Sequence, residues 1–150
     1  MKSTALALGF VLTLLHADRS FCQSPQPEPN SPTILETVKY IQAYTSDDIQ
    51  LDGTTLTMNH GPYDYEVNLL NVHAEQFKYD TSLVSLSCPG DANCIPYSNC
   101  PKPICKYHAR NVEIHPTDAI IAPRVLNAVT HLIRLVQQDA HPKDNDPFAR

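Results

Sequence analysis

Residues 123–136 read PRVLNAVTHLIRLV, and this stretch decides the fold class more than any other part of the chain. Its apolar positions are Val125, Leu126, Val129, Leu132, Ile133 and Val136. They recur at spacings of three and four, with polar residues between them, which is the pattern of an amphipathic helix. Pro123 suits the first helical position, and Pro142 ends the pattern. The sequence therefore predicts a long helix from about Pro123 to Ala140 that buries one face.

Upstream of this helix the apolar period changes to two, which is typical of strands with one buried face. Strands are predicted at residues 49–51, 56–58, 63–69, 83–88, 104–108 and 111–115. Asp52-Gly53 is a two-residue hairpin signal between the first two strands. The motif Asn59-His60-Gly61-Pro62 is expected to break the second strand, before the regular alternation of Tyr63 to Leu69.

A second, shorter helix is predicted from about Pro32 to Tyr44. Thr33 and Glu36 have the spacing of a capping box, and apolar residues follow at helical intervals. The order of helix, strands and long helix is typical of the α+β class. We expect an antiparallel meander or a small curled barrel, with the long C-terminal amphipathic helix packed on the sheet.

Two stretches resemble small exported bacterial proteins of unassigned activity, which pair a β-meander with a closing C-terminal helix. They are residues 82–95, SLVSLSCPGDANCI, and residues 123–136 quoted above. The arrangement is also similar in outline to pleckstrin-homology-like folds, which end a curled sheet with one helix. The resemblance implies a shape and no catalytic residue. Pleckstrin-homology domains proper hold phosphoinositides with basic loops, and this acidic chain shows no such cluster.

The first 22 residues have the pattern of a secretory signal peptide. Lys2 precedes an apolar run of eleven residues, Ala5 to Leu15, and small polar residues follow. Eleven residues are too few to span a bilayer, which needs about 20. We expect cleavage after Cys22 and a secreted or periplasmic chain that begins at Gln23. Residues 23–32 (QSPQPEPNSP) then predict an extended Pro-rich linker, residues 33–140 a single α+β domain, and residues 141–150 a disordered tail.

Composition excludes several classes of function. The formal net charge is −5, which argues against a nucleic-acid binder that relies on net positive charge. The chain has no Trp and four Gly, which argues against a carbohydrate-binding aromatic platform and against Gly-rich phosphate loops. We expect an acidic globular domain without a membrane span, whose partner is a protein or a small-molecule ligand.

The cysteines of the predicted domain fall within a short region. In an exported chain an even number of cysteines is typical of disulfides, and three connectivities are possible here. Cys88–Cys94 with Cys100–Cys105 is favoured, because each pair closes a short loop rich in turn residues. The alternative is a zinc site formed by Cys100, Cys105 and His108, since thiolate and imidazole suit zinc. The spacing lacks the tight C-x2-C knuckle, which favours disulfides.

No stretch has the spacing of a known catalytic motif. Neither the H-E-x-x-H zinc motif nor the G-x-S-x-G nucleophile elbow is present. The expected binding surface is His60, Tyr63 and Tyr65 together with the cysteine loops. Asp47 and Asp48 are adjacent in a polar turn, and we expect both carboxylates to point apart into water.

The sequence favours a non-enzymatic binding or interaction module, with no cofactor predicted. Two alternatives stay open. The chain is a Cys/His metal-binding protein, with or without enzymatic activity, or it is a small hydrolase whose residues come from separate loops and leave no motif.

The predicted processing and disulfides can be tested by the mass of the exported protein. The mass should match a chain that begins at Gln23 and should be about 4 Da below that of the thiol form, two hydrogens for each disulfide. The protein should also resist alkylation without reductant. Alkylated cysteines, or a mass that retains residues 1–22, would contradict the prediction.

Overall fold

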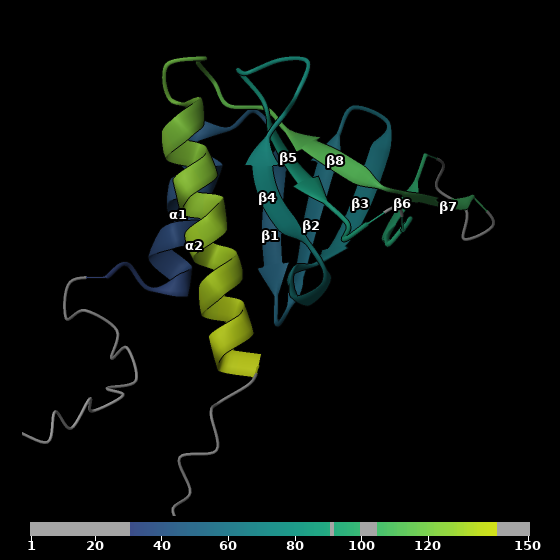
Figure 1. Cartoon of the computed structure of the whole chain (residues 1–150), viewed down its shortest axis with the longest axis horizontal. Helices are drawn as coiled ribbons and strands as arrows, with labels where there is room; N and C mark the ends of the chain where they lie inside the picture. The colour runs from purple at the N-terminus through teal and green to yellow at the C-terminus, as the bar shows by residue number, and fades with distance from the viewer. Residues whose placement is uncertain (1–30, 91, 100–104, 141–150) are drawn as a thin grey trace, which may run out of the picture. The chain divides into compact units, whose positions relative to one another are not determined.

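A computed structural model describes residues 31–90, 92–99 and 105–140 of the 150-residue chain (Figure 1). Every helix and strand of the described residues lies in the compact unit that begins at Pro32. The helices are α1 (Ile34–Tyr44) and α2 (Ala122–Ala140), with a 3-10 turn η1 (Leu69–Asn71). The strands are β1 (Asp48–Asp52), β2 (Thr55–His60), β3 (Tyr63–Asn68), β4 (His73–Gln76), β5 (Val84–Ser87), β6 (Ile95–Ser98), β7 (Lys106–Ala109) and β8 (Asn111–Ile114).

Helix α1 begins where the capping box predicts. The Thr33 backbone N–H donates to Glu36 Oε2 at 2.8 Å, and the Glu36 N–H donates to Thr33 Oγ1 at 3.3 Å. The hydrogen bonds that the Thr33 backbone N–H and the Thr33 hydroxyl donate to Oε2 lower the pKa of the Glu36 carboxyl, since they favour its charged form. Two of the free backbone donors at the helix N-terminus are therefore satisfied, which fixes the start of the helix.

The strands form two antiparallel sheets rather than one meander. Sheet one has the order β1-β2-β3-β6-β7, and sheet two has the order β4-β5-β8. The chain leaves sheet one through η1, builds β4 and β5 in sheet two, and returns to sheet one at β6. The α+β class is confirmed, and so is the C-terminal helix packed on the sheet. Neither sheet closes, so the alternative of a small barrel is wrong.

Both tight turns of sheet one differ slightly from the sequence prediction. Asp52 pairs with Thr55, so the first turn is Gly53-Thr54 rather than Asp52-Gly53. Gly53 takes φ +56°, in the left-handed region that favours glycine. In the second turn His60 is the last residue of β2 and pairs with Tyr63, so His60 is not part of a break in the strand.

Strands β4 and β6 were not predicted by the apolar period. Their sequences are HAEQ and IPYS, each four residues long, with β4 largely exposed and β6 containing Pro96. Strand β3 has less of a buried face than its alternation suggests, because Val67 is buried, Tyr65 is half-buried and Tyr63 is exposed. Strand β5 is buried at every position, including the hydroxyl-bearing Ser85 and Ser87.

Helix α2 provides one side of the core. It begins at Ala122, one residue before the predicted start, and it packs against α1, η1, β4 and β5. The side chains that it buries are Ala122, Val125, Val129, Leu132, Ile133 and Val136. Burial of one such aliphatic side chain stabilises the fold by about 1.5–3 kcal/mol. No helix among the described residues is both long and apolar enough to cross a membrane.

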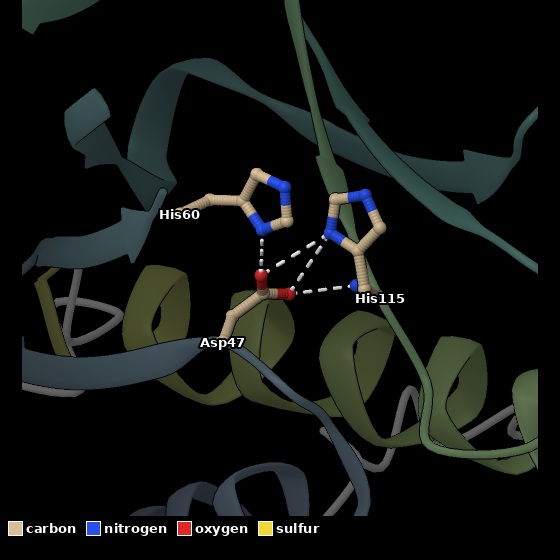
Figure 2. A group of neighbouring side chains, drawn as sticks. All are labelled: Asp47, His60 and His115. Carbon is tan, nitrogen blue, oxygen red and sulfur yellow. Dashed lines mark hydrogen bonds and ion pairs between the residues drawn. The ribbon is translucent and has the colours of Figure 1, made fainter. Parts of the chain in front are cut away.

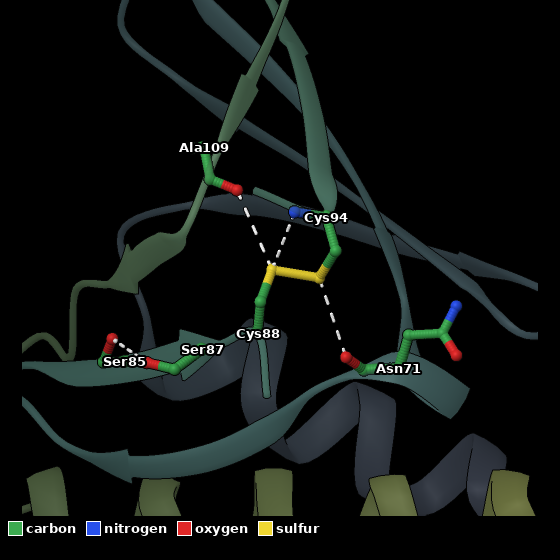
Figure 3. Close-up of a disulfide and its surroundings, with 6 residues drawn as sticks. All are labelled: Asn71, Ser85, Ser87, Cys88, Cys94 and Ala109. Atoms are coloured by element: carbon green, nitrogen blue, oxygen red, sulfur yellow. Dashed lines mark hydrogen bonds between the residues drawn. A yellow bond between two sulfur atoms is a disulfide. The ribbon is translucent and has the colours of Figure 1, made fainter. Parts of the chain in front are cut away.

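One disulfide joins the two sheets. Cys88 follows the end of β5 in sheet two and is bonded to Cys94, which precedes β6 in sheet one (Figure 3). The Cys94 backbone N–H also donates to Cys88 Sγ at 3.0 Å. The predicted Cys88–Cys94 pair is therefore confirmed. The Cys100–Cys105 pair stays a prediction, because Cys100 lies outside the described residues.

If α2 closes the core, Leu132→Asp should prevent folding, because the change buries an unpaired charge in a fully enclosed position. Asn127→Asp, at an exposed position of the same helix, should change the free energy of unfolding by less than about 0.5 kcal/mol. Circular dichroism during thermal unfolding distinguishes the variants. A cooperative transition for Leu132→Asp at the wild-type temperature would contradict this packing.

Candidate functional site

Asp47 lies between α1 and β1, and its side chain is fully buried, with 0% exposed. The sequence prediction for this residue is wrong, since the carboxylate does not point into water. Asp48 is exposed as predicted. The two differ because successive side chains of an extended segment point to opposite sides, so one of an adjacent pair can face inward.

Two histidines and one backbone amide surround the Asp47 carboxylate (Figure 2). His60 Nδ1 lies 2.8 Å from Oδ1, and His115 Nδ1 lies 3.1 Å from Oδ1 and 3.4 Å from Oδ2. The His115 backbone N–H donates to Oδ2 at 2.7 Å. Both carboxylate oxygens are thus hydrogen-bonded, which is what a buried carboxylate requires.

Strand pairing brings these segments together. The register of β1 and β2 pairs Asp48 with Asn59, so the next position places Asp47 beside His60. On the other side, the end of α1 pairs with the segment after β8. The Ser46 N–H donates to the His115 carbonyl at 2.9 Å. The Thr117 N–H donates to the Tyr44 carbonyl at 2.9 Å, and Thr45 forms an isolated antiparallel β-bridge with Pro116.

The imidazole rings of His60 and His115 stack on one another. Their centroids are 4.0 Å apart and their planes differ by 12°. The His60 side chain is 47% exposed and the His115 side chain is 29% exposed, so solvent reaches both rings. In Figure 2 the second ring nitrogen of each histidine, Nε2, lies on the side of the ring away from Asp47.

This arrangement has the chemistry of a metal site. One donor atom from each of Asp47, His60 and His115 lies within 4.8 Å of the others, and no other group of three His, Cys, Asp or Glu side chains among the described residues meets this criterion. A carboxylate that accepts from histidine Nδ1 fixes the ring tautomer and leaves Nε2 as an electron-pair donor. Histidines held in this way are common ligands of zinc and related ions.

Only one of the sequence-predicted binding residues, His60, belongs to this cluster. Asp47 and His60 are 13 residues apart, whereas Asp47 and His115 are 68 apart, and no short motif has such spacings. Of the alternative zinc set, His108 is exposed on β7 and Cys100 lies outside the described residues. The signals that were available are a histidine at the end of the strand predicted at 111–115 and another in the motif predicted to break the strand at 56–58.

Tyr63 and Tyr65 belong to a row of four aromatic rings. Tyr65 pairs with Tyr97 across β3 and β6, and Tyr97 pairs with Tyr107 across β6 and β7. Ring centroids are 6.2 Å apart for Tyr63 and Tyr65, 5.6 Å for Tyr65 and Tyr97, and 5.4 Å for Tyr97 and Tyr107. We call these residues the tyrosine strip. Burial, and then the nearby negative charge of Glu113, raise the pKa of the Tyr65 phenol.

A scan against protein-family models, a search of curated proteins and a search of solved structures each found no match to this chain. The likeness in shape to pleckstrin-homology-like folds stays a prediction. Any function is therefore inferred from the side chains that the fold brings together, of which the Asp47 cluster is the most organised.

Asp47→Ala should destabilise the fold by about 1–3 kcal/mol, because it leaves the His115 backbone N–H without its acceptor. The matched control is Asp48→Ala, whose carboxylate is exposed and should contribute less than about 0.5 kcal/mol. Urea unfolding of both variants measures the difference. Equal midpoints would show that the Asp47 hydrogen bonds do not stabilise the fold.

Proposed function

We propose that this chain is an exported metal-binding protein that holds a divalent transition-metal ion at His60 and His115. The single observation that carries the proposal is a fully buried carboxylate hydrogen-bonded to Nδ1 of two stacked histidines, one exposed and one half-buried. A buried Asp with two imidazole partners is a costly arrangement for a protein to build, and an ion on the outer side of the rings explains its use.

The Nε2 atoms are the proposed donors, and Asp47 is the partner that orients them. Both Nδ1 atoms already face the carboxylate, so they are occupied. Two nitrogens bound to one tetrahedral zinc ion lie roughly 3.3–3.4 Å apart, given Zn–N distances of about 2.0–2.1 Å. The planes of the two rings differ by only 12°, so their Nε2 lone pairs run nearly parallel, and both rings have to rotate before the two Nε2 atoms can face one ion.

Imidazole donors indicate the class of ion. Zinc, copper and nickel favour histidine nitrogen, whereas calcium and magnesium take oxygen ligands. Two protein donors leave at least two positions of a tetrahedral ion for water or another ligand. The site is therefore proposed as an open one, unlike a structural zinc site with four protein ligands.

Export is the second part of the proposal. The signal-like residues 1–22 and the Pro-rich residues 23–32 support it, as does the Cys88–Cys94 disulfide, because disulfides persist in oxidising compartments. A second local disulfide, Cys100–Cys105, is part of the same proposal. The chain acts as a binding module rather than an enzyme in this proposal, with the metal ion as its first ligand.

Zinc titration by calorimetry tests the metal site. The wild-type chain should bind one zinc ion, and His60→Ala and His115→Ala should each weaken binding at least 100-fold, because one remaining imidazole cannot chelate. His108→Ala is the control, an exposed histidine on β7 that is also the histidine of the alternative site. Loss of binding in His108→Ala alone would overturn the proposal and favour the cysteine region.

Asp47→Asn separates the two possible roles of the carboxylate. An orienting role predicts a loss of about 10- to 100-fold in zinc affinity, as for other second-shell partners of histidine ligands. A direct ligand role predicts a loss as large as that of His60→Ala. The variant should be tested below its unfolding temperature, measured in the same buffer.

A further inference from the structure

The tyrosine strip crosses three neighbouring strands of sheet one. Tyr63 and Tyr65 lie on β3, Tyr97 lies on β6, and Tyr107 lies on β7, the last strand of the sheet. Tyr65 is the cross-strand partner of Tyr97, and Tyr97 is the cross-strand partner of Tyr107. The side chains of cross-strand partners stand on the same face of a sheet, so the phenol ends of these three residues lie side by side.

Tyr97 is the central ring of the strip. Its centroid lies 5.4 Å from that of Tyr107, 5.6 Å from that of Tyr65 and 6.1 Å from that of Tyr63. The two end residues, Tyr63 and Tyr107, are 36% and 48% exposed. Tyr65 and Tyr97 are half-buried. An oxidant in solution therefore meets the end rings first, and each end ring is in contact with a less accessible ring.

We propose that Tyr97 and Tyr107 form a site of oxidative cross-linking, at which a peroxidase and hydrogen peroxide join the two phenol rings through a carbon–carbon bond. Their contact is the closest between rings of the strip, and Tyr107 is open to the oxidant. The inference uses only the tyrosine strip and does not depend on the proposed metal site.

The reaction removes one electron and one proton from each phenol. Oxidation of the exposed Tyr107 gives a tyrosyl radical. An electron from Tyr97 refills this radical, while a proton leaves Tyr97 for solvent and another returns to Tyr107. A second oxidation of Tyr107 then places two radicals side by side.

The two radicals couple at ring carbons next to their hydroxyl groups. One carbon–carbon bond forms and the C–H bond at each of these two carbons breaks, with the protons passing to solvent as both oxygens return to the phenol form. One molecule of hydrogen peroxide accepts the two electrons and two protons in total and becomes two molecules of water. The product is dityrosine.

A second pair of tyrosines in contact gives the competing product. Tyr40 and Tyr44 lie one turn apart on α1, with ring centroids 4.7 Å apart. A bond between them would join two residues of one helix and would not link strands. Tyr79 is 84% exposed, and its ring contacts Phe77. Tyr79 therefore tests whether exposure without a neighbouring phenol is sufficient.

The cross-link would fix the edge of sheet one. Strand β7 is four residues long, is largely exposed, and lies at the end of the sheet next to β6. Short exposed segments are among the parts of a fold that open most easily. A covalent bond between Tyr97 and Tyr107 holds the two strands in register, so the cross-linked chain should unfold at a higher temperature.

Treatment of the Tyr40→Phe/Tyr44→Phe chain with peroxidase and hydrogen peroxide tests the proposal without the competing pair. Dityrosine has its own blue fluorescence, and the chain has no Trp to mask it. The treated monomer should show this fluorescence and a mass lower by two hydrogen atoms. Digestion should release a cross-linked peptide pair that contains Tyr97 and Tyr107.

Single changes in this background locate the site. Tyr97→Phe and Tyr107→Phe should each lose most of the dityrosine fluorescence, because phenylalanine keeps the ring but has no hydroxyl to oxidise. Tyr79→Phe is the matched control and should keep the yield of the parent chain. Treatment should raise the unfolding temperature of the parent chain and leave that of Tyr107→Phe unchanged.

The proposal is overturned by a treated monomer that contains no dityrosine, or by an equal yield in Tyr97→Phe. Covalent dimers without a cross-link inside the monomer would overturn it too, since the exposed rings would then react only between molecules. An unchanged unfolding temperature in the cross-linked parent chain would show that the bond does not fix β7.

Discussion

The buried carboxylate of Asp47 is the contact on which the arrangement of the two sheets at the histidines depends. It is hydrogen-bonded to Nδ1 of His60, which ends strand β2 of sheet one. It is also hydrogen-bonded to the backbone N–H and to ring Nδ1 of His115, which follows strand β8 of sheet two. The Cys88–Cys94 disulfide joins the same two sheets at the other end of β5. Sheet two is thus tied to sheet one at both of its ends, by hydrogen bonds at one and a covalent bond at the other.

The core and the candidate site are built from different elements of the fold. Helix α2 buries its apolar side chains and carries none of the three residues of the candidate metal site. The histidines stand at strand ends, where a side chain can reach both a buried carboxylate and solvent. The tyrosine strip lies on the same sheet and begins at Tyr63, the cross-strand partner of His60.

The sequence predicted the elements whose pattern is local. The α2 period, the Thr33–Glu36 capping box and the short loop closed by Cys88–Cys94 are each determined by residues a few positions apart, and each is confirmed. The strands β4 and β6 were missed, because four residues with mixed polarity carry too little periodic signal. The split into two sheets was missed for a related reason: pairing partners are chosen across the chain, and the apolar period is the same for one sheet or two.

The sequence by itself determined the α+β class, the closing helix, the acidic charge and the proline-rich and signal-like N-terminal pattern, because these follow from composition and local spacing. Only the tertiary structure decided the candidate site. Asp47 has an equally acidic neighbour in Asp48, and His115 has no neighbouring motif, so nothing local separates a buried carboxylate from a solvated one. Burial and hydrogen bonding between residues 13 and 68 positions apart make that distinction, and they exist only once the two sheets have packed.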